Sequence, residues 1–458
     1  MDRLILTWKI NTQAIPATQH PRLVYLLLKV RGEQGTDSTP RPVNLALVVD
    51  VSESMNIRVL SNGEFKRLAR NGTLQELLID GVPAWHSADI PVEMIARLPR
   101  KIDRVRDALR AVIEELRPYD TFSLTVFAGR AALLIPTTRG TEKKRILDML
   151  DQLDRLQLGD ETYIGQGLRV GLEELERSKT DGVARRLLVL TDGFTRDENE
   201  CRAWAVYARR HRIPISTLGL GGEFNEELMI PIADQTGGEA YLVETLETLP
   251  AILSKELQRA QRARYSNVEL KLHFPEGVAV RYAYRLSPTI APLETPDQGG
   301  SYSFQLGNIS PEEEIALVLE LVVPPRPPGA YLLAKALLTC DALPGLESGA
   351  KTRADLVVEY TTDWARASAF DPQVMRAVEV LSAYKLQQQA ISDLRAGEIG
   401  SATRKLRAAA TRLLDMGENK LAEEFQRQAA TLELYGRADA THTRKLQYET
   451  RMLSRKLT

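Results

Sequence analysis

Between about residues 43 and 262, hydrophobic and polar positions alternate with the periods of strands and helices in a regular order. The first strand is predicted at 43–50, where a run of mainly aliphatic residues ends on Asp50. Such a run is typical of a strand buried on both faces of a parallel sheet. Further strands are predicted at 121–128, 130–136 (an edge strand), 185–192, 213–221 and 239–243, and helices at 101–117, 142–153, 164–179, 198–211, 224–237 and 246–261. Strands that alternate with helices in this way predict a doubly wound, Rossmann-like parallel sheet.

One segment breaks this pattern directly after the first strand. Residues 56–98 are mostly polar, with short apolar pieces at 74–79 and 82–85. In a tight α/β unit the helix begins within a few residues of the strand, whereas here the next amphipathic segment begins near Arg100. We therefore expect residues 56–98 to be an insertion on the rim where ligands bind, and Trp85 and His86 within it favour a lid or specificity element as much as a surface decoration.

The pattern differs on both sides of this region. Two strands are predicted at 3–10 and 22–30, and short strands separated by Pro- and Gly-rich turns follow residue 264, which is typical of an antiparallel sandwich. Because a lone hairpin is marginal in water, the two N-terminal strands are expected to join that sandwich, which leaves the α/β domain inserted in it. From Asp371 onward the pattern is helical. The expected domains are N-terminal strands 1–40, an α/β domain 41–262, a β-sandwich 263–362 and a helical domain 363–458.

Composition and charge exclude several classes of protein. The 458 residues include 60 Lys plus Arg and 61 Asp plus Glu, so the net charge of -1 argues against a nucleic-acid binder. No apolar run reaches the roughly 20 residues of a membrane helix, and the N-terminus lacks the apolar core of a signal peptide. Cys201 and Cys340 stand far apart, which makes a disulfide framework improbable. These features favour a cytoplasmic location without membrane or nucleic-acid partners.

Oxygen-bearing side chains gather at one predicted rim of the sheet. Asp50, Ser52 and Ser54 follow the first strand, Thr162 precedes a helix, and Asp192 ends a central strand. Taken singly, each is an ordinary cap or turn residue. Because ligands of open α/β sheets collect at the carboxyl ends of the strands, the shared rim indicates a site for a hard divalent cation.

These five residues carry a resemblance. Over about residues 43–260 the chain resembles the von Willebrand factor A domain family, and Asp50, Ser52 and Ser54 match its Asp-x-Ser-x-Ser motif, with Thr162 and Asp192 matching the two later positions. The resemblance implies a metal-ion-dependent adhesion site that binds Mg2+ (or Mn2+ or Ca2+). It also implies a protein–protein interaction module, not an enzyme, in which an acidic side chain of a partner completes the metal shell.

Two positions depart from the family pattern. Glu53 stands where the family commonly has Gly, and Tyr163 stands where the family often has Asn. A second acid, Glu161, directly precedes Thr162. Either the two acids face solvent, or a rim carboxylate raises cation affinity or fills the open coordination position. The alternating charges of 101–117, among them Lys101, are interpreted as a solvated helix face.

Two other functions stay open from the sequence. Asp50 at the end of a first strand is also the place of a phosphoryl-accepting nucleophile in Mg2+-dependent hydrolases, although Ser52 stands where phosphatases of the haloacid dehalogenase type usually carry a second Asp. The second alternative function is that of a structural scaffold with a vestigial metal site. The sequence identifies neither the partner nor the oligomeric state, and the five scattered histidines show no metal-ligand spacing.

Overall fold

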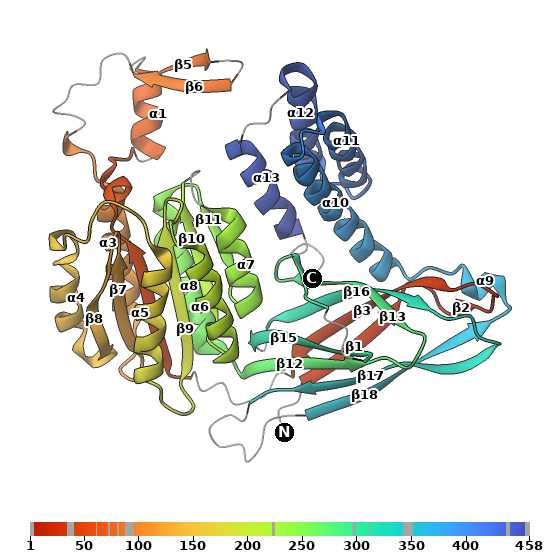
Figure 1. Cartoon of the computed structure of the whole chain (residues 1–458). Helices are drawn as coiled ribbons and strands as arrows, with labels where there is room; N and C mark the ends of the chain where they lie inside the picture. Colours follow the sequence, from red (N-terminus) through yellow and green to blue (C-terminus); the bar gives the residue numbers. More distant parts are fainter. Residues whose placement is uncertain are drawn as a thin grey trace. The chain divides into compact units, whose positions relative to one another are not determined.

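The chain divides into two compact units. In the computed structural model the described residues are 4–33, 41–60, 62–71, 74–79, 82–87, 96–221, 225–295, 299–310, 312–341, 351–436 and 440–453. One unit comprises residues 40–261, and the other combines residues 1–39 with 262–458. The elements of both are labelled in Figure 1.

The central unit is built on a six-stranded sheet in the order β11-β10-β9-β4-β7-β8. Neighbouring strands from β11 to β7 are parallel, and β8 pairs antiparallel with β7 at the edge, where an edge strand was predicted. The strands are β4 (Val43–Asp50), β7 (Thr121–Phe127), β8 (Ala131–Arg139), β9 (Ala184–Thr191), β10 (Ile215–Leu220) and β11 (Ala240–Val243).

Helices cover both faces of this sheet (Figure 1). Alternate residues of β4 enter two different apolar clusters: Leu45 and Leu47 pack with the helices of one face, and Ala46 and Val48 pack with those of the other. Burial on both faces explains why β4 reads as a nearly continuous apolar run. The first face carries α3 (Lys101–Glu115), α4 (Lys143–Leu150) and α8 (Leu249–Arg262), and the second α5 (Ile164–Arg177), α6 (Glu198–Arg210) and α7 (Glu226–Thr236).

The segment predicted as an insertion has its own secondary structure. It contains α1 (Asn62–Arg70) and an antiparallel hairpin of β5 (Leu74–Ile79) and β6 (Val82–Ser87). The two apolar pieces recognised in the sequence form this hairpin. Trp85 and His86 lie in β6, but their side chains fall outside the described part of the structure.

The second unit contains two five-stranded sheets, ordered β1-β3-β16-β13-β14 and β15-β12-β17-β18-β2. Neighbours are antiparallel except β18 and β2, and apolar side chains of both sheets enter one core cluster. Because β3 pairs with β16, the N-terminal strands share a sheet with a strand that follows the α/β unit. The strands are β1 (Leu4–Ile10), β2 (Ile15–Pro16), β3 (Arg22–Gly32), β12 (Tyr265–His273), β13 (Ala279–Ser287), β14 (Ala291–Pro292), β15 (Ser301–Ile309), β16 (Glu314–Val323), β17 (Gly329–Thr339) and β18 (Lys351–Thr361).

Helices end the chain, as the pattern from Asp371 predicted. Gly397 and Gly417 follow the first two long helices with positive φ angles of 79° and 80°, a conformation that glycine adopts readily at a helix end. The helices are α9 (Trp364–Ala367), α10 (Pro372–Arg395), α11 (Ile399–Asp415), α12 (Asn419–Tyr435) and α13 (Ala440–Met452). Apolar side chains of α10 to α13 share a cluster with Leu27 and Val318 of the first sheet. Among the described helices, none has the length and apolar character needed to span a membrane.

Candidate metal centre

The candidate site lies where the strand order of the α/β sheet reverses. From β4 the chain moves to β7 on one side, and then crosses to β9 on the other side of β4. Such a switch point leaves a crevice outside the carboxyl ends of the two strands, where ligands of open α/β sheets bind. β4 ends at Asp50 and β9 is followed by Asp192, so both acids come to this crevice.

The first motif folds into a tight turn around the Asp50 carboxylate. The Ser52 backbone N–H donates to Asp50 Oδ1 at 2.9 Å, and Thr191 Oγ1 donates to Asp50 Oδ2 at 2.7 Å. Thr191 reaches Asp50 because the parallel register pairs Val49 with Leu190. The hydroxyl oxygens of Ser52 and Ser54 lie 3.1 Å apart. Asp50 and Ser52 are buried, while Ser54 is partly exposed.

Asp192 joins this cluster from the neighbouring strand. The Ser54 hydroxyl donates to Asp192 Oδ1 at 2.6 Å. Four of the five residues predicted from the sequence therefore form one continuous set of contacts: Asp50, Ser52, Ser54 and Asp192.

Thr162 is tied to the same rim through its backbone. Its carbonyl accepts hydrogen bonds from the Arg196 backbone N–H at 3.0 Å and from Thr195 Oγ1 at 3.1 Å. These two residues belong to the loop that follows Asp192, and the next residue, Tyr163, donates its N–H to the Ala128 carbonyl at 3.0 Å, beyond the end of β7. The Thr162 loop is thus held between the loops that follow β7 and β9.

Comparison with known proteins identifies the domain that carries Thr162 and Asp192 of this rim. The family model of the von Willebrand factor type A domain matches residues 97–255, and a solved structure described as von Willebrand factor type A from Catenulispora acidiphila superposes with a TM-score of 0.75. The chain contains a von Willebrand factor A domain. At 14% sequence identity, with 98% of this chain and 97% of the other covered, that structure establishes the common fold.

Three further comparisons extend beyond this domain. An uncharacterized protein of Synechocystis sp., sll0103, is 25% identical over 315 residues, which span 68% of this chain and 74% of that protein. Residues 372–456 match the C-terminal alpha-helical domain named after it. The ArnB paralog VWA2 from Sulfolobus acidocaldarius superposes with a TM-score of 0.53 at 16% identity and 99% coverage of both chains. The chain therefore combines a von Willebrand factor A domain with a helical domain of the Sll0103-like type.

The donor atoms of the rim have the chemistry that a hard cation requires. Asp50, Ser52, Ser54, Thr162 and Asp192 offer carboxylate and hydroxyl oxygens, the ligand type that Mg2+ and Ca2+ prefer. Two ligands at right angles around Mg2+, each about 2.1 Å from it, lie about 3 Å apart, and the two serine oxygens are separated by 3.1 Å. Within the described residues no cluster of three or more His, Cys, Asp or Glu could hold a metal ion.

Burial shapes the electrostatics of the site. Desolvation raises the pKa of Asp50 to about 6, although hydrogen bonds from Ser52 and Thr191 act in the opposite direction. The nearby Asp192 carboxylate contributes a further increase in this pKa. Two carboxylates on a largely buried rim favour a neighbouring positive charge.

The structure corrects the interpretation of Lys101. Its side chain was assigned to a solvated helix face, but its ammonium group lies 2.6 Å from Asp192 Oδ2, and only 20% of the side chain is exposed. Ion pairs at a spacing of three residues, which were predicted for this helix, are present: Asp103 pairs with Arg100 and with Arg106. No local pattern could have indicated the Lys101–Asp192 contact, because the two residues are 91 positions apart in the chain.

The two acids beside the motif residues, Glu53 and Glu161, are exposed. Glu53 begins a short 3-10 helix (Glu53–Asn56) with its side chain toward solvent. Glu161 accepts a hydrogen bond from the Tyr163 hydroxyl at 3.0 Å and lies 3.5 Å from the Arg196 guanidinium. Their exposure agrees with the simpler of the two interpretations, in which both acids face solvent.

Sequence reasoning missed three supporting residues on the β9 side. Thr191 donates to Asp50, Thr195 Oγ1 accepts the Ile164 N–H at 2.9 Å, and Asp197 accepts the Gly165 and Gln166 N–H groups at 3.1 Å each. Thr195 and Asp197 thereby cap α5 from another loop. In the sequence, Thr195 and Asp197 have the pattern of ordinary turn residues, so no local signal indicates that they cap α5.

Proposed function

We propose that the von Willebrand factor A domain of this chain is a divalent-metal-dependent protein-interaction module. Asp50, Ser52, Ser54, Thr162 and Asp192 would hold Mg2+ (or Mn2+ or Ca2+), and an acidic side chain of a partner protein would complete the shell. The observation that supports this most directly is the continuous set of contacts from Asp50 through both serines to Asp192 at the switch point. Since Mg2+ commonly keeps part of its shell for water or a ligand, neutral hydroxyls from the protein leave room for an external carboxylate.

We also propose a four-part organisation of the chain. In it, strands of 1–40 and 263–362 form one β-sandwich that carries the von Willebrand factor A domain of 41–262, and the helical domain of 363–458 follows. Pairing of β3 with β16 and the common core of the two antiparallel sheets support the sandwich. The family match over 372–456 supports the helical part.

The geometry disfavours a phosphoryl-transfer hydrolase. A nucleophilic carboxylate needs an oxygen that can reach the phosphorus atom of the substrate, but Asp50 is buried. A phosphatase assay on the purified chain with Mg2+ tests this. Turnover that disappears in Asp50→Ala would overturn the choice of an interaction module.

The partner hypothesis is tested by affinity capture from the native cell in the presence of Mg2+ or of a chelator. We expect a specific protein to be captured with Mg2+ and lost both with chelator and with Ser54→Ala, which removes one hydroxyl ligand. Asp107→Ala is the matched control, because Asp107 is an exposed acid on α3. Capture that is indifferent to metal and to Ser54 contradicts the proposal, and a vestigial site predicts in addition that no metal binds.

A further inference from the structure

A lysine of the chain itself lies against the candidate metal site. Lys101 Nζ is 2.6 Å from Asp192 Oδ2, while the other oxygen of this carboxylate accepts the Ser54 hydroxyl. The Asp192 side chain is only 1% exposed, so this pair is screened far less than a surface ion pair. Through Asp192 and Ser54, the ammonium group is connected to every residue of the first motif.

The position of Lys101 is fixed by the base of the insertion. The Lys101 backbone N–H donates to the Ile57 carbonyl at 2.9 Å, and the Val59 N–H donates to the Pro99 carbonyl at 2.9 Å. These bonds join the chain that enters the insertion to the chain that leaves it. Lys101 is the first residue of α3, so the helix and the closed base together place it.

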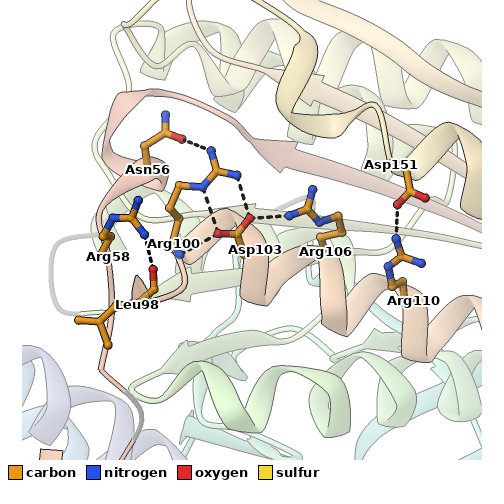
Figure 2. Close-up of polar contacts among 8 residues, drawn as sticks. All are labelled: Asn56, Arg58, Leu98, Arg100, Asp103, Arg106, Arg110 and Asp151. Carbon is orange, nitrogen blue, oxygen red and sulfur yellow. Dashed lines mark hydrogen bonds and ion pairs between the residues drawn. The ribbon is translucent and has the colours of Figure 1, made fainter. Parts of the chain in front are cut away.

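Arginine side chains close the same base, as Figure 2 shows. The Arg100 guanidinium donates to Asn56 Oδ1 at 3.2 Å and to both Asp103 oxygens, at 3.0 and 2.8 Å. The Arg58 guanidinium donates to the Leu98 carbonyl. Asn56 lies two residues after Ser54, so the segment that follows the candidate metal turn is linked to Arg100, the residue directly before Lys101.

We propose that Lys101 is an internal cation of the adhesion site, which competes with the divalent metal for Asp192 and sets the metal affinity. This rests on the proposed metal-binding function. With Lys101 in contact, the charge of the two carboxylates is partly compensated, and a divalent cation that engages Asp192 has to displace the ammonium group or bind against its repulsion.

The test is a titration of the purified full chain with Mn2+, followed by electron paramagnetic resonance of the free ion. We compare the wild type, Lys101→Met, Lys101→Arg and Lys144→Met, the last being an exposed lysine on α4. Lys101→Met should tighten the Mn2+ dissociation constant about tenfold or more, as expected when a close charge pair is removed. Lys101→Arg and Lys144→Met should stay near the wild type.

A second readout separates competition from a general change of fold. Without metal, Lys101→Met leaves Asp192 without its counter-charge, so its melting temperature should fall below that of the wild type, and Mn2+ should raise it by a larger increment. Equal or weaker Mn2+ binding by Lys101→Met overturns the role of Lys101, while metal binding itself stands. Absence of Mn2+ binding in all four proteins overturns the metal-dependent function and this inference with it.

Discussion

At the scale of single residues, the hydrogen bonds and the ion pair that the Asp50 and Asp192 carboxylates accept hold the candidate site together. Asp50 receives the Ser52 N–H and the Thr191 hydroxyl, and Asp192 receives the Ser54 hydroxyl and the Lys101 ammonium group. Buried acids with defined partners have restricted orientations, as a preformed cation site requires. Thr191 and Lys101 contribute as directly as the motif residues do.

The two cysteines are expected to differ in reactivity. Burial, together with the nearby Asp197 carboxylate, raises the pKa of the Cys201 thiol well above its ordinary value, so little reactive thiolate forms there. Cys340 is partly exposed. In the native chain, iodoacetamide should therefore modify Cys340 while Cys201 stays unmodified, and both should react in denaturant. Peptide mass spectrometry measures this, and early native labelling of Cys201 would contradict the packing around α6.

At the scale of elements, the rim is assembled by loops that hold one another. The N-terminus of α5 is capped by Thr195 and Asp197, which lie more than 30 residues away in sequence. Helix caps are usually local, whereas this one fixes the Thr162 loop to the loop that follows Asp192. The spacing of two segments of the candidate metal site therefore depends on this helix cap.

Removing that cap should weaken both the fold and the site. Asp197→Ala leaves the Gly165 and Gln166 N–H groups without their acceptor, and we expect a loss of about 1–3 kcal/mol in the free energy of unfolding. Urea denaturation measures it. Asp181→Ala, at an exposed turn acid, is the control. Because the Thr162 loop loses its anchor, Mn2+ affinity should fall as well, and a variant with unchanged stability would show that the cap is dispensable.

Which contacts of the site can be predicted from the sequence depends on whether a rule of topology or the path of a single side chain determines them. Residues such as Asp50 and Asp192 could be placed together because parallel strands bring their carboxyl ends to one edge, which is a rule of topology. The Lys101–Asp192 pair and the Asp197 cap could not, since each depends on the path of a side chain between segments far apart in the chain. The insertion was located by the delayed start of α3, and its helix and hairpin appeared only with the structure.

At the scale of the whole molecule, N-terminal and C-terminal segments are interdependent within the second unit. Asp371 caps α10 by accepting the N–H groups of Gln373 and Val374, and it lies 3.0 Å from Lys9 of β1. Leu27 and Val318 of the first sheet pack in the same cluster as the helices. Strands β1 to β3 and the C-terminal helices should therefore unfold together.

This connection predicts a pH dependence. Burial acts to raise the pKa of Asp371, but hydrogen bonds from Lys9 and from the α10 backbone outweigh it, so the pKa lies below its ordinary value. A carboxyl with a lowered pKa in the folded state stabilises above its unfolded pKa of about 3.9, and the contribution disappears as pH falls through the folded value. The difference in unfolding free energy between the wild type and Asp371→Asn should thus shrink below about pH 4. A difference that is constant with pH would contradict the ion pair.

The most direct test of the central claim is a calorimetric titration of Mg2+ into the purified chain, repeated with Ser54→Ala. Binding of one Mg2+ per chain by the wild type, with a large loss of affinity in the variant, is the predicted result, because Ser54 joins the two halves of the rim through Asp192. Circular dichroism on both proteins checks that the variant is folded. Failure of the folded wild type to bind Mg2+ or Mn2+, or equal binding by Ser54→Ala, would contradict a metal-dependent adhesion site at Asp50 and Asp192.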